Sequence, residues 1–263
     1  MEIRGKQLRV AIKLRFDRQF WIRWLPAGWE EDTFDFVDEH VSNGVTFIDI
    51  GTWIGPISLC AAALGARVIS LEPDPVAHRS LVANVELNRD RLPGSVEVLQ
   101  HAFNAKPGTV RIFGNHRGFG TSGSSSIGTG WRSISVPSCT PDDLVSMAAG
   151  GRSVLKVDIE AHEYFCGAEL ARLRRELDAP MNLSVHPSAL RKSRGWRFWR
   201  PRNADAEEIY ARTKALLQGF SDCTLHASNA PHSLDGEDLR RRLLPDDGDA
   251  AEFTVIATTR ESA

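Results

Sequence analysis

Apolar runs of strand length alternate with helical patterns along most of the chain. Strand-like runs rich in β-branched residues occur at 45–51, 66–74, 96–103, 109–114, 153–160, 180–187, 223–228 and 251–259. Helix-period patterns lie between them at 56–65, 75–89, 162–178 and 206–220. This alternation predicts an α/β fold with a mostly parallel sheet covered by helices on both faces, and the two late strands suit an antiparallel edge.

One segment, 114–137, breaks this pattern because it is rich in glycine and serine. Such a composition predicts an irregular segment rather than a helix or a strand. It is either a flexible surface loop or a loop that faces the substrate, since loops on such scaffolds often carry function. We assign 1–40 to a basic and aromatic helical extension and 41–263 to the main domain.

The composition of the chain argues against several classes of binding partner. The chain has 263 residues, a net charge of −2 and a sequence pI near 6.5, so neither nucleic acid nor an anionic membrane attracts it as a whole. No apolar run approaches the roughly 20 residues that span a bilayer, and the basic N-terminus lacks a long apolar signal region. We therefore expect a cytoplasmic protein without a membrane span. The four cysteines form no C-x-x-C pair, which argues against a zinc site or a disulfide framework.

The stretch "FIDIGTWIG" (47–55) ends a buried strand with an acid and two glycines, Asp49, Gly51 and Gly55. A glycine-rich turn between a strand and a helix points backbone N–H groups at a ligand and lets the ligand approach closely. The dinucleotide fingerprint G-x-G-x-x-G is not met, because Asp49 and Ile54 stand where its first and third glycines belong. An acid at the strand tip would repel a pyrophosphate, but it suits the ammonium and sulfonium charges of S-adenosylmethionine.

The next strand supplies a second acid. Glu72 ends the run "VISLE" 23 residues after Asp49, near the spacing at which an acid accepts the ribose hydroxyls of a nucleotide cofactor. One carboxylate can accept both hydroxyl protons. The alternative is a cap on the following helix, a role for which Asp74 is an equal candidate.

These motifs resemble those of a known family. The stretches "FIDIGTWIG", "LEPDP", "NVELN" and "VLKVDIEAHE", with "GSSSI" and "PDDL" in the same order, are similar to FkbM-type S-adenosylmethionine-dependent methyltransferases from about 45 to 187. The resemblance implies a Rossmann-like class I methyltransferase fold with a seven-stranded sheet, and O-methylation of a hydroxyl on a sugar or another secondary metabolite. It also implies cofactor contacts at Asp49, Gly51, Gly55 and Glu72, and an active-site segment around Asp158.

The chain departs from the family's pattern at three positions. Ala161 stands where the family usually has glycine, Ser184 where it often has an acid, and Trp53 where the residue is usually small or polar. Cofactor binding tolerates these changes more easily than a particular substrate or metal assignment does.

Methyl transfer to an alcohol needs groups that position the hydroxyl and remove its proton. Asp158 ends the strand "VLKVD", so it faces the crevice at the carboxyl ends of the strands, and it is the first candidate for the base or for a substrate-orienting carboxylate. His186 ends the next strand and is the second candidate, with a buried structural histidine as the alternative. His162 follows in the turn and either shares proton handling or is simply solvated. Glu163 suits the first turn of the following helix.

Two further features stay open. Asp158, Glu160 and His186 offer ligands for a divalent ion such as magnesium, but no specific ligand spacing supports one, and the metal is left unassigned. The stretch "RKSRGWRFWRPR" (191–202) interleaves basic and aromatic residues, and is either a lid or acceptor-binding loop or an RNA site. The N-terminal "FWIRW" packs as an ordinary helix, covers the cleft, or meets a second subunit in a homo-oligomer.

The leading hypothesis is an S-adenosylmethionine-dependent O-methyltransferase with a small-molecule acceptor and no nucleic-acid partner. A non-catalytic or RNA-binding relative with the same fold is the alternative, motivated by the basic aromatic stretch and the three departures. An NAD-linked oxidoreductase is disfavoured by Asp49 and Ile54. The sequence leaves the identity of the acceptor and the regiochemistry open.

Overall fold

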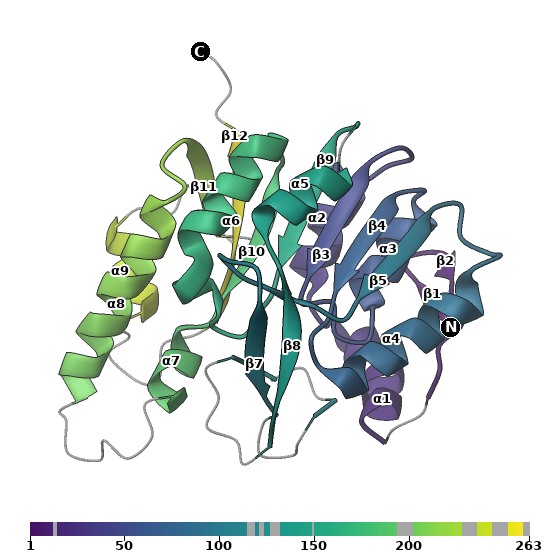
Figure 1. Ribbon diagram of the computed structural model, residues 1–263, viewed down its shortest axis with the longest axis horizontal. Coiled ribbons are helices and arrows are strands. Elements are labelled where there is room, and N and C mark those ends of the chain that lie inside the picture. The colour runs from purple at the N-terminus through teal and green to yellow at the C-terminus, as the bar shows by residue number, and fades with distance from the viewer. Residues whose placement is uncertain are drawn as a thin grey trace.

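The computed structural model describes residues 1–12, 15–114, 119–120, 124–126, 132–148, 150–193, 202–227, 236–243 and 252–259. A seven-stranded sheet forms its centre (Figure 1). From edge to edge its strands are β5 (Ser95–Leu99), β4 (Arg67–Leu71), β3 (Thr46–Ile50), β9 (Ser153–Val157), β10 (Met181–Val185), β12 (Phe253–Thr259) and β11 (Cys223–Ala227). All neighbours are parallel except β12, which runs antiparallel to both β10 and β11. The predicted parallel sheet with an antiparallel C-terminal edge is confirmed.

Helices cover both faces of this sheet. On one face lie α2 (Glu31–His40), α3 (Pro56–Ala63) and α4 (Pro75–Asn88); on the other lie α5 (Pro141–Ala148), α6 (Glu163–Leu177), α7 (Pro187–Ser193), α8 (Arg202–Gln218) and α9 (Gly236–Leu243). Along β3, Phe47 joins the hydrophobic cluster of the first group, whereas Ile48 and Ile50 join that of the second. Every residue of β3 is buried, which explains why its sequence is a nearly continuous apolar run.

A second, three-stranded sheet holds β6 (Ala102–Phe103), β8 (Ser133–Cys139) and β7 (Thr109–Phe113), in that order. It corrects two predictions. The run 96–103, predicted as one strand, is divided between β5 of the main sheet and β6 of the small one. Residues 133–137, predicted as irregular, belong to β8, because Val136 pairs with Val110 and both are buried in the small sheet's own core.

The N-terminal segment begins with an antiparallel pair, β1 (Glu2–Ile3) and β2 (Lys6–Gln7), and continues through α1 (Arg15–Gln19), the π-helical turn η1 (Phe20–Trp24) and the 3₁₀ turn η2 (Leu25–Ala27). Phe20 and Trp21 are almost fully buried in the same hydrophobic cluster as Phe47 and Trp53. The ring centroids of Phe20 and Trp53 lie 4.5 Å apart in an edge-to-face arrangement. The segment 1–40 thus contributes aromatic side chains to the core of the sheet domain.

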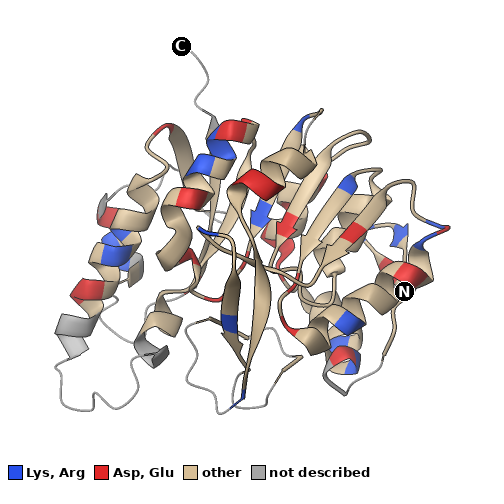
Figure 2. Ribbon diagram, viewed as in Figure 1, with Lys and Arg blue, Asp and Glu red and all other residues tan. Residues whose placement is uncertain are grey.

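Acidic and basic positions are interspersed over the helices of the described chain (Figure 2). None of the helices in the described ranges combines the length and the apolar character that crossing a bilayer requires. All four cysteines are buried and carry free thiols, so they act as small packing residues.

Candidate active site

A cavity of about 230 Å³ opens at the carboxyl ends of β3, β4, β9 and β10. The carboxyl ends of parallel strands meet at one edge of a sheet, where such folds bind their ligands. Among the predicted site residues, the cavity is lined by Gly51, Glu72, Asp158, His162 and His186. Two other predicted cofactor residues, Asp49 and Gly55, are not part of this lining.

The turn after β3 depends on its two glycines. Gly51 and Gly55 have φ angles of 83° and 92°, in the left-handed region that side chains disfavour. A Cβ atom on Gly51 would lie 1.7 Å from the carbonyl oxygen of Asp158, and one on Gly55 would lie 2.5 Å from Leu81 Cδ1. The two glycines therefore let the strand β9 and the helix α4 approach the turn closely. Trp53, between them, also has a positive φ, of 52°.

Glu72 is held at the wall of the cavity. Its Oε2 accepts a hydrogen bond from the backbone N–H of Trp53 and its Oε1 accepts one from that of Asp74, both at 2.7 Å. Asp74, not Glu72, caps α4, because its Oδ1 accepts from the N–H groups of Val76 and Ala77. Burial raises the pKa of Glu72 to about 8.

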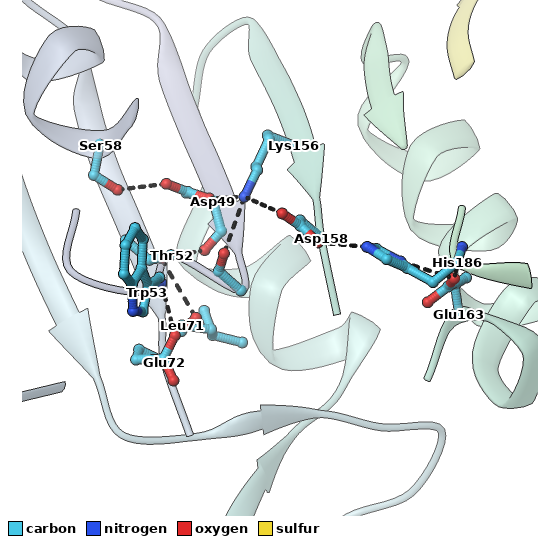
Figure 3. A network of polar contacts seen from close by, with 11 residues as sticks. Asp49, Thr52, Trp53, Ser58, Leu71, Glu72, Lys156, Asp158, Glu163 and His186 are labelled. Atoms are coloured by element: carbon cyan, nitrogen blue, oxygen red, sulfur yellow. Dashed lines mark hydrogen bonds and ion pairs between the residues drawn. The ribbon is translucent and has the colours of Figure 1, made fainter. Parts of the chain in front are cut away.

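Asp49 lies behind the glycine turn in a buried polar network (Figure 3). Its Oδ2 accepts a hydrogen bond from Ser58 Oγ at 2.7 Å, and its Oδ1 lies 3.4 Å from Lys156 Nζ. Lys156 also donates to the carbonyl oxygen of Gly51 at 2.9 Å and lies 3.7 Å from Asp158 Oδ2. Burial alone would lower the pKa of Lys156, but Asp49 and Asp158 outweigh it and raise that pKa. Lys156 is thus a buried cation shared by two acids.

His186 continues the network on the other side of Asp158 (Figure 3). Its Nε2 lies 3.2 Å from Asp158 Oδ1, and its Nδ1 lies 3.2 Å from Oε1 of the fully buried Glu163. Burial would lower the pKa of His186, but Glu163 and Asp158 raise it well above the usual value. Burial would raise the pKa of Asp158, but Lys156 and His186 hold it below the usual range. At neutral pH the two residues therefore form an imidazolium–carboxylate pair.

Part of the glycine- and serine-rich segment faces the cavity, and a role in binding the substrate stays a prediction. Ser124, Ser125 and Ser126 all line the cavity. Ser126 Oγ lies 2.6 Å from His162 Nδ1, and Ser125 Oγ donates to the backbone carbonyl of Glu160 at 2.5 Å. Burial lowers the pKa of His162, so its imidazole is neutral at neutral pH.

The turn after β9 is strained. Glu160 and Ala161 have φ angles of 50° and 71°, in the left-handed region. A residue with a Cβ atom is disfavoured there, which gives a physical reason for the glycine that the resembling family usually has at the position of Ala161. Burial raises the pKa of Glu160 to about 8.

Three residues could supply ligands to a divalent ion. Asp158, Glu160 and His186 each place one ligand atom within 4.8 Å of the others. Two carboxylates and an imidazole suit several transition metals better than they suit magnesium, which prefers oxygen ligands. Asp158 and His186 are already paired with each other, so the metal stays unassigned.

Sequence reasoning missed Lys156 and Glu30, which both line the cavity. Lys156 carries a recognisable signal, because it is the one charged residue of strand β9 and stands between the apolar residues Leu155 and Val157. Glu30 carries none, since it precedes the mixed polar sequence of α2. The predicted lid or RNA site at 191–202 lies outside the residues whose side chains the structure describes.

No family model matches the chain. Two curated relatives, both named ribosomal protein L11 methyltransferase, match a short part of it. The one from Anoxybacillus flavithermus (strain DSM 21510 / WK1) is 46% identical over 54 residues, which are 20% of this chain and 17% of that protein. The one from Pelotomaculum thermopropionicum (strain DSM 13744 / JCM 10971 / SI) is 38% identical over 65 residues, or 24% of this chain and 20% of that protein. The chain thus spans about a fifth of the length of the curated relatives that it matches.

Similar solved structures include methyltransferases of tetrapyrroles. Precorrin-6y C5,15-methyltransferase from Geobacter metallireducens GS-15 has a TM-score of 0.44 at 11% identity, over 96% of this chain and 94% of that one. Magnesium protoporphyrin IX methyltransferase from Synechocystis PCC 6803 was solved with bound S-adenosylmethionine. It has a TM-score of 0.44 at 10% identity, over 95% of this chain and 86% of that one.

The fold is assigned from the strand order of this chain and does not depend on the similarity to these solved structures. Two parallel strands flank β3 on each side, and the antiparallel β12 is inserted between β10 and β11. This is the Rossmann-like fold of class I methyltransferases. The predicted fold is confirmed, whereas membership of the FkbM-type family stays a prediction.

Proposed function

We propose that the protein is an S-adenosylmethionine-dependent methyltransferase that methylates a hydroxyl of a small molecule, such as a sugar or another secondary metabolite. The observation that carries the proposal is the meeting, in one cavity, of the Gly51 turn, the buried carboxylate of Glu72 and the Asp158–His186 pair. The methyltransferase fold supports the choice of reaction. The resemblance of "VLKVDIEAHE" to FkbM-type enzymes supports oxygen as the acceptor atom.

Glu72 is the proposed acceptor for the ribose hydroxyls of the cofactor. Each of its carboxylate oxygens accepts one backbone N–H and keeps a further lone pair for a hydroxyl. Gly51 lines the cavity, and its missing side chain lets the backbone of Asp158 pack against the turn beside the proposed cofactor site. Asp49 does not contact the cofactor in this proposal, because its carboxylate is engaged by Ser58 and Lys156 behind the turn. It supports the glycine turn instead.

The reaction is an in-line displacement. The acceptor oxygen forms a bond to the methyl carbon while the carbon–sulfur bond breaks, and the hydroxyl loses its proton to a base. We assign that base to His162, because it lines the cavity and because burial lowers its pKa, so that the imidazole is neutral and can accept a proton at neutral pH. Asp158 is a weak base beside Lys156 and His186, so it takes the other role predicted for it, orienting the hydroxyl.

Calorimetry tests the class of cofactor before any acceptor is known. We expect S-adenosylmethionine and S-adenosylhomocysteine to bind, and NAD to give no heat beyond dilution. The dinucleotide-binding fold lacks the inserted antiparallel strand that this sheet has, which further disfavours NAD. Binding of NAD without S-adenosylmethionine would contradict the proposal and favour the oxidoreductase.

A protein acceptor is the second candidate, because both partial relatives are named ribosomal protein L11 methyltransferase. Methyl-labelled S-adenosylmethionine, incubated with the enzyme and either ribosomal proteins or a small-molecule extract, separates the two. Label in the small-molecule fraction alone supports the hydroxyl acceptor. Label in the protein fraction supports the second candidate, and cofactor binding without transfer to either would favour a non-catalytic relative.

A further inference from the structure

Glu30 is a carboxylate that the N-terminal segment directs to the cavity. It follows η2, immediately precedes α2, and lines the cavity beside Trp29. Its backbone is left-handed, with φ 49° and ψ 42°, a conformation that costs free energy for a residue with a side chain. Glu30 occupies the N-cap position of α2, yet its side chain accepts no capping hydrogen bond. Its carboxylate therefore does not cap the backbone N–H groups of α2.

The Glu30 carboxylate lacks a full set of partners. Thr33 offers it a side-chain hydrogen bond, but its Oε2 atom is buried and has no hydrogen-bond partner among the described residues. Burial raises the pKa of Glu30 to about 7, and the negative charge of Asp158 contributes to the rise. Burying an unpaired carboxylate is costly, so a site of this kind fits a ligand that brings hydrogen-bond donors and positive charge.

The protein's own cations do not fill this role. The positive charge of Lys156 acts on Glu30, but the contacts of Lys156 go to Asp49, to Asp158 and to the carbonyl oxygen of Gly51. Asp49, which the strand-tip motif predicts as the cofactor's acid, is in turn engaged by Lys156 and Ser58. Among the described residues, Glu30 thus forms no ion pair, whereas Asp49 is paired with Lys156.

We propose that Glu30 binds the α-ammonium group of S-adenosylmethionine, so that the N-terminal segment completes the cofactor site. An ammonium carries three donors and a positive charge, which match a buried carboxylate oxygen without a partner. Because it assigns Glu30 to the cofactor, this inference rests on the proposed function.

Two ligands that differ in the amino-acid part of the cofactor test the inference by calorimetry on the full chain. S-adenosylhomocysteine carries the ammonium, and 5′-methylthioadenosine keeps the adenosine and the sulfur but lacks it. We expect Glu30→Gln to weaken S-adenosylhomocysteine about tenfold to a hundredfold and to change 5′-methylthioadenosine less than about twofold. The matched control is Glu31→Gln at the neighbouring exposed position, which should leave both affinities unchanged.

The outcomes separate this inference from the proposed function. If Glu30→Gln binds S-adenosylhomocysteine as wild type does, or loses both ligands equally, Glu30 does not bind the ammonium, while the proposed function stands. A wild-type chain that binds neither ligand would overturn both.

Thermal unfolding without ligand gives a second readout. Since Glu30→Gln removes a buried charge that lacks a partner, we expect the melting temperature above pH 7 to stay equal or to rise. A large fall, or failure to fold, would show that the carboxylate is structural and would overturn the inference.

Discussion

Glu72 and Asp74 stand two residues apart and act on different parts of the molecule. Asp74 stabilises the start of α4 and also accepts hydrogen bonds from Gly120 and Ser124 through its Oδ2. Glu72 instead holds the backbone of the glycine turn at Trp53, on the wall of the cavity. Removing Asp74 should therefore weaken the fold, whereas removing Glu72 should weaken the cofactor site.

We expect Glu72→Ala to weaken the binding of both S-adenosylmethionine and S-adenosylhomocysteine by about 1.5–3 kcal/mol, because two hydrogen bonds between the ribose and the buried carboxyl group of Glu72 are lost. Titration calorimetry measures the change. Glu97→Ala is the control, since Glu97 is exposed on β5 and pairs only with Arg67 among the ion pairs described. A Glu72→Ala variant with wild-type affinity would show that Glu72 only supports the turn.

The two roles proposed for His162 and Asp158 differ in their pH dependence. The lowered pKa of His162 means that the rate should be full at neutral pH and should fall only below pH 6.5, its usual value. We expect His162→Gln to reduce kcat by about 10²–10⁴ and to remove that acid limb of the pH–rate profile. His78→Gln is the control, because burial also lowers the pKa of His78 but this residue lies on α4, outside the cavity lining.

For Asp158→Asn, the loss of an orienting carboxylate should reduce kcat and raise the acceptor KM, while cofactor affinity and the acid limb remain. If Asp158→Asn abolishes the acid limb and His162→Gln keeps it, Asp158 is the base after all. Loss of activity in His186→Gln alone would move the base to the end of β10.

Asp158, Glu160 and His186 allow a test of the unassigned metal. Because Asp158 and His186 already neutralise each other, we expect a chelator such as EDTA to change the wild-type rate less than about twofold. The rate is measured before and after chelation. A strong loss that added magnesium or manganese restores would show that the three residues hold an ion.

At the scale of elements, β9 joins the two halves of the polar network. Its Lys156 contacts Asp49 near the tip of β3 on one side and Asp158 at the cavity on the other. A buried cation in mid-strand is tolerated only because its acids are buried beside it.

We therefore expect Lys156→Met to destabilise the fold by about 3–5 kcal/mol, since it leaves the buried Asp49 without its cation. Urea unfolding followed by circular dichroism measures the loss. The double variant Lys156→Met/Asp49→Asn should recover part of it, because the uncompensated charge is then gone. Strictly additive losses would mean that the two side chains do not depend on each other.

The elements differ in how far the sequence predicts them. Strands such as β3 and β9 are buried on both faces, so their apolar runs are nearly continuous and easy to recognise. The small sheet was missed because β6 has only two residues, too few to show a period, and β8 continues directly from a glycine-rich segment.

In the candidate site, too, some features are predictable from the sequence and others are not. Gly51, Glu72 and Asp158 were predicted from their places at strand ends, and all three line the cavity. The sequence does not predict which acidic side chain forms an ion pair with which basic side chain. The pairing of Asp49 with Lys156, and of Glu163 with His186, depends on side chains that only the folded chain brings together.

On the scale of the whole molecule, the segment 1–40 and the sheet share one hydrophobic cluster. Phe20, Trp21 and Phe36 are each at most 2% exposed, and each such aromatic stabilises the fold by about 1.5–3 kcal/mol. We expect a chain of residues 41–263 to lose cooperative thermal unfolding, as measured by calorimetry against the full chain. If 41–263 melts as the full chain does, the segment 1–40 is an extension that the fold of the main domain does not need.

The place of β12 affects how the protein is made. β11 pairs with β12 alone within the main sheet, and β12 also closes the edge of β10. The ribosome releases β10 and β11 first, so each keeps an unpaired edge until β12 has been synthesised. Open strand edges attract other chains. Translation that stalls before Phe253 should therefore leave a nascent chain that depends on chaperones, although the cavity-forming strands β3, β4 and β9 are already complete.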